Sequence, residues 1–211
     1  MENAKIITDI QEKYDSLSRE QILNNLNIAI SLGKTKGMDV DRYCALPKIA
    51  NRSKHTVMSW FNRPHVKIAL FDLCMIARYL NYNIYTFFTV RNDEAEVKVG
   101  DFLVANEYNN SHYPTDSADI FIRAYNLQYE TSKDIVLDNL EKYYGTSAEI
   151  LAHHLNIRQK TIMEICGCTK QTYYAWFNRS RKNVKIPLIP LCRLVLNIDM
   201  DIFDVFKSNS E

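Results

Sequence analysis

The chain has 211 residues, of which 46% are hydrophobic and 24% are charged, and its formal net charge is +1. This length allows one large or two small globular domains with ordinary cores. No stretch approaches the roughly 18 apolar residues of a transmembrane helix, and the first residues lack the pattern of a secretory signal. Five cysteines, an odd number, favour reduced thiols and a cytoplasmic location.

The first part of the chain predicts two helices in succession. Residues 2–14 have the spacing of a short amphipathic helix with isoleucines on its inner face. We assign residues 1–17 to an amino-terminal helix or arm. Ser18 followed by Gln21 is a capping-box pattern, which predicts a second helix that ends near Leu32.

Two parts of the sequence repeat. The tetrapeptide Trp-Phe-Asn-Arg occurs at residues 60–63 and again at residues 176–179. Back to residue 49, the first copy aligns with the second without a gap at an offset of 116 residues. At an offset of 114 residues, the helix that begins after Ser18 matches one that begins after Ser132. Both matches indicate an internal duplication.

Each copy of the repeated segment predicts a helix, a sharp turn and a second helix. Gly167 in the second copy and Asn51 in the first tolerate the left-handed backbone of such a turn. Thr169 and Ser53 are suited to cap the second helix, whose tryptophan faces inward. Pro47 is expected to kink or shorten the leading helix of the first copy. Two helices joined in this way form a helix-turn-helix.

After both motifs, the segments Ile76–Asn81 and Leu194–Asn197 complete a pattern that resembles the lambda-repressor-like (Cro/XRE) family of helix-turn-helix proteins. The resemblance covers roughly residues 38–88 and 147–206. It implies an all-α fold with two duplicated lambda-repressor-like modules. It also implies a sequence-specific DNA-binding transcriptional regulator, of a kind common in phages and mobile elements. We expect no catalytic residues, no metal and no cofactor.

The distribution of charge supports this division. Residues 34–67 contain eight Lys or Arg against two Asp or Glu, a net +6, and residues 156–185 contain seven against one, also +6. Residues 92–150 contain four against twelve, a net −8. Two basic islands at matching repeat positions predict contact with the phosphates of double-stranded DNA. We expect four parts: the arm, a first module at 18–90, a packed, partly helical acidic connector at 91–131, and a second module at 132–211.

The expected interface has two sets of residues. In a helix-turn-helix, the first turn of the second helix enters the major groove. The residues expected to face the bases are Lys54, His55, Met58, Ser59, Lys170, Gln171, Tyr174 and Ala175. Those expected at the DNA backbone are Arg52, Ser53, Asn62, Arg63, Lys67, Thr169, Asn178, Arg179, Arg181, Lys182 and Lys185. Gln171 is the most informative because glutamine can pair bidentately with adenine.

Other functions stay open at this point. The modules would also suit a protein-binding inhibitor or adaptor, such as a phage counter-defence protein, with the acidic connector as contact surface or nucleic-acid mimic. RNA binding would need an exposed aromatic platform, for which Tyr173 and Tyr174 are the candidates. The apolar residues 102–104 and 120–125 offer an interface for a homodimer.

Two kinds of chemistry are not expected. Cys166 and Cys168 could be combined with His153 and His154 as a zinc site, but one residue separates the cysteines instead of two to four. The sequence has no glycine-rich phosphate loop and no nucleophile elbow, so we do not expect an enzyme.

Overall fold

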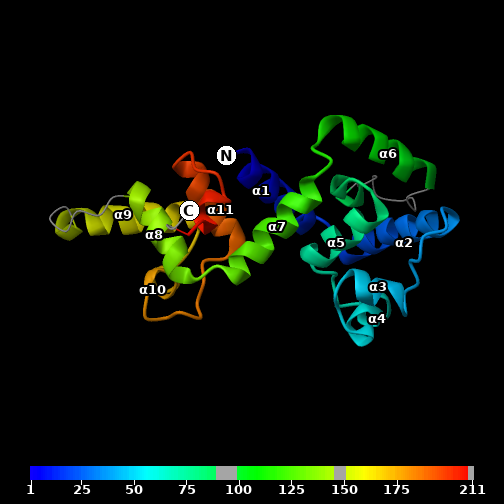
Figure 1. The fold of residues 1–211 in the computed structure, drawn as a ribbon, viewed down its shortest axis with the longest axis horizontal. Helices are drawn as coiled ribbons and strands as arrows, with labels where there is room; N and C mark the ends of the chain where they lie inside the picture. Colours follow the sequence, from blue (N-terminus) through cyan, green and yellow to red (C-terminus); the bar gives the residue numbers. More distant parts are fainter. Residues whose placement is uncertain (89–98, 145–150, 209–211) are drawn as a thin grey trace. The chain divides into compact units, whose positions relative to one another are not determined.

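The structure is a computed structural model that describes residues 1–88, 99–144 and 151–208. These residues form helices and contain no strand, which confirms the predicted all-α fold for the described part (Figure 1). The α-helices are α1 (Glu2–Asp15), α2 (Arg19–Thr35), α3 (Ala45–Ile49), α4 (Lys54–Asn62), α5 (Leu70–Leu80), α6 (Val99–His112), α7 (Ser117–Glu130), α8 (Lys133–Tyr144), α9 (Leu151–Cys166), α10 (Lys170–Phe177) and α11 (Leu188–Asn197). Two short 3-10 helices are η1 (Ile84–Phe88) and η2 (Asp204–Phe206).

The chain divides into two compact units. We call residues 9–122 the N-unit, and residues 1–8 together with 123–211 the C-unit. The same order of helices occurs twice: α1 to α5 followed by η1, and α7 to α11 followed by η2. α6 has no counterpart in this order. Together α6 and α7 occupy most of the predicted connector, of which residues 91–98 lie outside the described part.

The second helix of each unit begins as the sequence predicts. The hydroxyl of Ser18 accepts a hydrogen bond from the backbone N–H of Gln21, and the Gln21 side chain accepts one from the N–H of Ser18. This reciprocal pair satisfies two donors that a helix start leaves unpaired, so it fixes where α2 begins. At the matching position the hydroxyl of Ser132 accepts from the N–H of Ile135 at 3.4 Å.

The sharp turns of both motifs have the predicted left-handed backbone. Asn51 has a φ of 51° and Gly167 a φ of 62°. After these residues the N–H of Arg52 donates to the carbonyl of Pro47 at 2.9 Å, and the N–H of Cys168 to that of Met163 at 3.0 Å. The predicted effect of Pro47 is confirmed, because α3 has only five residues whereas α9 has 16.

The helices that follow these turns are capped and anchored alike. Oγ of Ser53 accepts from the N–H of Thr56 at 3.1 Å, and Oγ1 of Thr169 accepts from that of Thr172 at 3.2 Å. The predicted caps are therefore confirmed. The tryptophan of each copy is buried, with 2% of Trp60 and 9% of Trp176 exposed.

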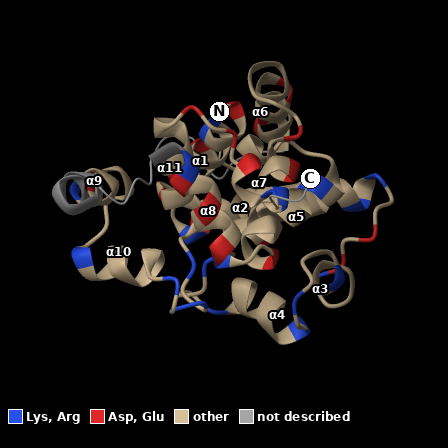
Figure 2. Cartoon of the chain, turned by 60° about the vertical axis from the view of Figure 1, so that its left-hand side comes forward, with Lys and Arg blue, Asp and Glu red and all other residues tan. Residues whose placement is uncertain are grey.

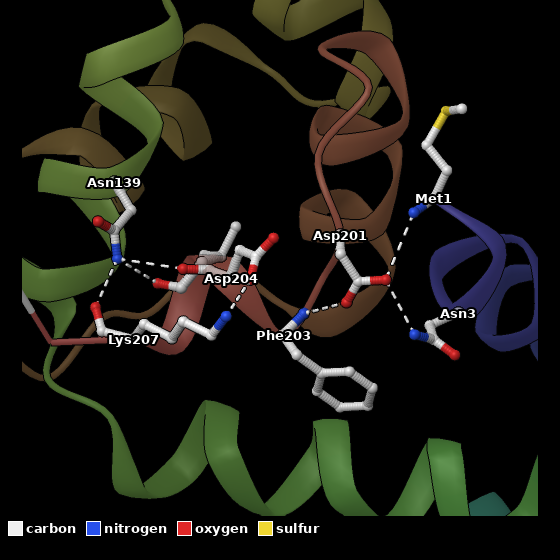
Figure 3. Close-up of polar contacts among 8 residues, drawn as sticks. Met1, Asn3, Asn139, Asp201, Phe203, Asp204 and Lys207 are labelled. Atoms are coloured by element: carbon white, nitrogen blue, oxygen red, sulfur yellow. Dashed lines mark hydrogen bonds and ion pairs between the residues drawn. The ribbon is translucent and has the colours of Figure 1, made fainter. Parts of the chain in front are cut away.

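A buried asparagine at one repeat position ties α2 and α8 to the last turn of their units. Nδ2 of Asn25 donates to the carbonyl oxygen of Phe87 at 2.9 Å. Nδ2 of Asn139 donates to the carbonyl oxygen of Val205 at 2.9 Å and to that of Lys207 at 2.8 Å (Figure 3). Since a buried amide must find partners inside the protein, these bonds select one position for η1 and η2.

One carboxylate, that of Asp201, connects the start of α1 to the rest of the C-unit. Asp201 accepts from Nδ2 of Asn3 at 2.9 Å, and its other oxygen accepts from the backbone N–H of Phe203 at 2.9 Å (Figure 3). The amino group of Met1 lies 3.4 Å from the same carboxylate. This side chain therefore joins the first turn of α1 to the loop before η2.

We expect Gly167→Ala to lower the free energy of unfolding by about 1 kcal/mol, because the φ of 62° is strained for any residue with a Cβ. Space is not the reason, since an added Cβ would lie 3.7 Å from its nearest neighbour, Nη1 of Arg193. The control is Gly100→Ala in α6, where nothing lies within 4 Å and alanine should be neutral or stabilising. Urea denaturation measures the free energy of unfolding of both variants. Equal losses would show that the left-handed backbone at residue 167 does not cause the effect.

Candidate nucleic-acid interface

The first turns of α4 and α10 are open to solvent. Lys54 and His55 are exposed at the start of α4, and Lys170, Gln171 and Tyr174 are exposed on α10. The other three residues expected to face the bases, Met58, Ser59 and Ala175, are half-buried. The Ser59 hydroxyl also donates to the carbonyl of Thr56 at 2.6 Å, so it is already paired within the helix.

Each of these first turns carries a lysine beside an exposed tyrosine. The ammonium of Lys170 lies 5.9 Å from the ring centre of Tyr174, one turn further along α10. The ammonium of Lys54 lies 5.1 Å from the ring of Tyr43, which comes from the loop before α3. The sequence analysis missed Tyr43 because nothing in its spacing relates it to α4.

A carboxylate orders the loop that holds Tyr43. One oxygen of Asp41 accepts from the backbone N–H of Tyr43 at 2.8 Å and from that of Cys44 at 2.9 Å. The first of these bonds is the main cause of the lowered pKa of Asp41. The exposed ring of Tyr43 therefore belongs to a turn that these two hydrogen bonds hold in place.

Two of the predicted DNA-backbone contacts have another role. Nζ of Lys67 donates to the carbonyl oxygens of Tyr14 and Leu17 at 2.9 Å each, at the end of α1. Nζ of Lys185 donates to the carbonyl oxygens of residues 128, 129 and 131 at 3.0, 2.6 and 2.8 Å, at the end of α7. These ammonium groups satisfy carbonyls that a helix end leaves unpaired. In this structure both ammonium groups are therefore occupied within the protein, and their contact with phosphates stays a prediction.

These contacts also show that the repeat includes α1 and α7. The hydroxyl of Tyr14 donates to the carbonyl of Ile68, and Nε2 of Gln128 donates to that of Ile186. Each donor precedes the capping serine of its unit by four residues. The sequence analysis assigned α1 to an arm and α7 to a connector, whereas both bind the loop after the tryptophan helix in the same way.

A second pair of cations, which the sequence analysis missed, binds the ends of α4 and α10. The guanidinium of Arg19 donates to the carbonyl oxygens of Trp60 and Val66 at 2.6 and 3.0 Å. At the matching position, Nζ of Lys133 donates to those of residues 175, 178 and 181 at 2.9, 2.8 and 3.1 Å. Burial lowers the pKa of Lys133. The only sequence signal was a basic residue directly after each capping serine.

Arg52 is also engaged within the protein. Its Nε lies 2.9 and 3.1 Å from the two carboxylate oxygens of Asp72, whose side chain is 3% exposed. Burial raises the pKa of Asp72, and the bond from Arg52 opposes that effect. A phosphate contact by Arg52 would have to replace this pair, because releasing Arg52 would leave a buried carboxylate unpaired.

Arg179 is surrounded by carboxylates of α8. Its Nη2 lies 2.7 Å from Asp138 and 3.0 Å from Glu141, and its Nη1 lies 3.6 Å from Asp134. The bond to Asp138 is the main cause of its raised pKa. The guanidinium of Arg179 is therefore also occupied within the protein, and its phosphate contact stays a prediction. Its counterpart Arg63 is exposed, with Nη2 3.4 Å from the imidazole of His55.

The other residues expected at the DNA backbone are exposed to solvent. Asn62, Arg181 and Lys182 are exposed, together with Arg63. The side-chain oxygen of Asn178 accepts from the N–H and the hydroxyl of Ser180, which shapes the loop after α10. Figure 2 shows the basic residues in this loop and at the start of α4, and the acidic residues on α8.

The structure also bears on the other expectations. Tyr173 is half-buried and stacks on Phe177 with ring centres 4.7 Å apart, so only Tyr174 offers an exposed ring on α10. Of the expected dimer interface, Leu103 and Val104 are exposed, whereas most of its other residues are buried: Phe102, Phe121, Ile122 and Ala124. Those four side chains pack in the interior of this structure.

Within the described part of the chain, no three His, Cys, Asp or Glu residues gather as a metal site would require. The side chains of His153 and His154 lie outside that part. Burial raises the pKa of the Cys166 thiol to about 12. None of the described helices combines the length and the apolar character needed to cross a membrane.

No protein-family model, no curated protein and no solved structure matches the chain.

We expect Lys185→Met to lower the free energy of unfolding by roughly 1–3 kcal/mol, because three carbonyl oxygens at the end of α7 lose a charged donor. The matched control is Lys182→Met in the same loop, whose side chain is exposed, and its effect should stay within about 0.5 kcal/mol. Urea denaturation of both variants measures the difference. Two equal losses, or none, would show that Lys185 is not a structural lysine.

Proposed function

We propose that the chain is a non-enzymatic, sequence-specific regulator that binds double-stranded DNA through the first turns of α4 and α10. The observation that carries the proposal is the twofold occurrence of one arrangement. In each unit, a left-handed turn at Asn51 or Gly167 leads into a capped helix whose tryptophan is buried and whose first turn is exposed. A helix presented in this way suits the major groove. The resemblance to the lambda-repressor-like family is part of this proposal.

The exposed residues fit such a role chemically. Lys54 and Lys170 place ammonium groups at the first turn, where they reach guanine acceptors or phosphates. Gln171 offers the donor and acceptor pair that matches adenine. The amino ends of α4 and α10 add backbone N–H groups that have no partner within the helix, and such groups favour a phosphate at the edge of the groove.

Internal contacts limit how many phosphates the chain can neutralise. Four of the predicted backbone contacts bind carbonyls or carboxylates of the protein itself: Arg52, Lys67, Arg179 and Lys185. Arg63, Arg181 and Lys182 remain, together with the lysines of the two first turns. Because the two first-turn lysines can reach guanine acceptors instead of phosphates, about four phosphate contacts per chain are a better expectation than the larger number that the charge of the basic islands suggests.

Binding to a protein is the second candidate. α6, which has no counterpart in the repeat, exposes a row of apolar side chains with exposed fractions from 38% to 65%: Val99, Leu103, Val104 and Tyr108. Such a row is typical of a contact surface for another protein. A chain used only in this way would not bind duplex DNA even at low salt, so a DNA titration separates the two candidates.

We expect the affinity of the chain for duplex DNA to fall by about a hundredfold between 50 and 200 mM salt, as about four phosphate contacts require. A fluorescence-anisotropy titration of labelled duplex at several salt concentrations measures this slope. Binding that ignores salt, or no binding at 50 mM, would rule out the proposed interface.

We expect Gln171→Ala and Arg63→Ala to weaken DNA binding in different ways. Gln171→Ala should relax the preference at one base position, at a cost of about 1–3 kcal/mol there. Arg63→Ala should weaken all sequences about equally and reduce the salt slope by about one contact. Selection from random duplexes, followed by titration of the selected site, distinguishes them. The reverse pattern would mean that Gln171 contacts the DNA backbone and that Arg63 reads a base.

A further inference from the structure

The two units differ most in the charges beside the end of the tryptophan helix. In the C-unit, Asp134, Asp138 and Glu141 lie on one face of α8, at intervals of four and three residues. All three approach the guanidinium of Arg179, at 3.6, 2.7 and 3.0 Å. Their side chains are 38–46% exposed, so the group is at the surface.

The N-unit has a different set at the matching positions. Residues 20, 24 and 27 of α2 are Glu20, Asn24 and Asn27, so one carboxylate stands where the C-unit has three. Glu20 pairs with Arg19 at 3.4 Å, and the amide oxygen of Asn27 accepts from Arg42 at 2.6 Å. At these three positions the N-unit therefore carries fewer negative charges than the C-unit.

The electrostatic consequence follows from the charge count. Three carboxylates around one guanidinium leave a local charge of −2, which repels a phosphate. Arg179 is also held by two short charge-assisted bonds, at 2.7 and 3.0 Å, which a phosphate would have to replace. Both effects reduce contact with the DNA backbone and leave the exposed groups of Lys170, Gln171 and Tyr174 in place.

Given the proposed DNA binding, we infer that Asp134, Asp138 and Glu141 lower the affinity of the C-unit for the DNA backbone, so that this unit depends more on its base contacts. Phosphate contacts position a protein on DNA, whereas base contacts specify the sequence. Weaker phosphate contacts lower the binding of the C-unit to random DNA, so this unit adds to affinity mainly where its base contacts are satisfied. The carboxylates of α8 therefore raise the specificity of the whole chain.

The test is a gain of binding, which loss of folding cannot produce. The full chain carrying Asp134→Asn, Asp138→Asn and Glu141→Gln frees Arg179 and removes three negative charges. We expect it to bind random duplex DNA about tenfold more tightly at 100 mM salt, with a salt slope steeper by about one phosphate contact. Adding Arg179→Ala to this variant should return the slope to that of the unchanged chain.

The control has the same change in net charge at another place. Glu12→Gln, Glu107→Gln and Asp116→Asn remove three exposed carboxylates of the N-unit that have no ion pair within the described residues. We expect this variant to gain less than about threefold in affinity, because only long-range attraction changes. Equal gains in both variants, or no gain beside α8 while the unchanged chain binds, would overturn the inference. Absence of duplex binding by every variant at low salt would instead refute the proposed function and the inference with it.

Discussion

Each unit depends on one interaction, a lysine ammonium that binds the carbonyl oxygens at the end of a helix. Lys67 binds carbonyl oxygens at the end of α1, and Lys185 binds those at the end of α7. The last carbonyls of a helix have no hydrogen-bond donor inside it and carry partial negative charge. An ammonium group supplies both a donor and a positive charge. Each lysine comes from the loop that follows the tryptophan helix. The bond therefore fixes this loop, and with it the end of α4 or α10, against the first helix of the unit. Burial lowers the pKa of Lys67, a cost that these charge-assisted bonds offset.

Sequence reasoning predicted the features that rest on local chemistry. The capping box at Ser18, the left-handed turn at Gly167 and the short helix around Pro47 each follow from the properties of residues close in the chain. The roles of Lys67 and Arg179 could not be predicted in this way, because their partners are brought near only by folding. A charged residue in a sequence shows its charge and not its partner. Backbone carbonyls, the partners of Lys67, leave no mark on the sequence at all. The one available signal was the recurrence of Val-Lys-Ile after both motifs.

The two copies also show why the repeat was only partly visible. Tyr14 and Gln128 make the same bond to the loop with a hydroxyl and an amide, and Arg19 and Lys133 bind the end of the tryptophan helix with different cations. The acceptor in each case is a backbone carbonyl, which any donor of suitable reach can satisfy. Side chains at such positions can differ while the contact is kept. The repeat therefore extends over α1 and α7, where no identical residues indicated it.

The net charge of a segment differs from the charge that its exposed side chains present to a ligand. Both motif segments have a net charge of +6, yet their cations are used differently. In the first, Arg52 and Lys67 are bound within the protein, and Arg63 is exposed. In the second, Lys185 and Arg179 are bound, and the carboxylates around Arg179 belong to α8, outside the segment. Equal counts along the sequence therefore correspond to unequal surfaces, because one carboxylate of α5, Asp72, pairs with Arg52, whereas three carboxylates of α8 surround Arg179. If these surfaces bind DNA, the two units must do so with different shares of backbone and base contact.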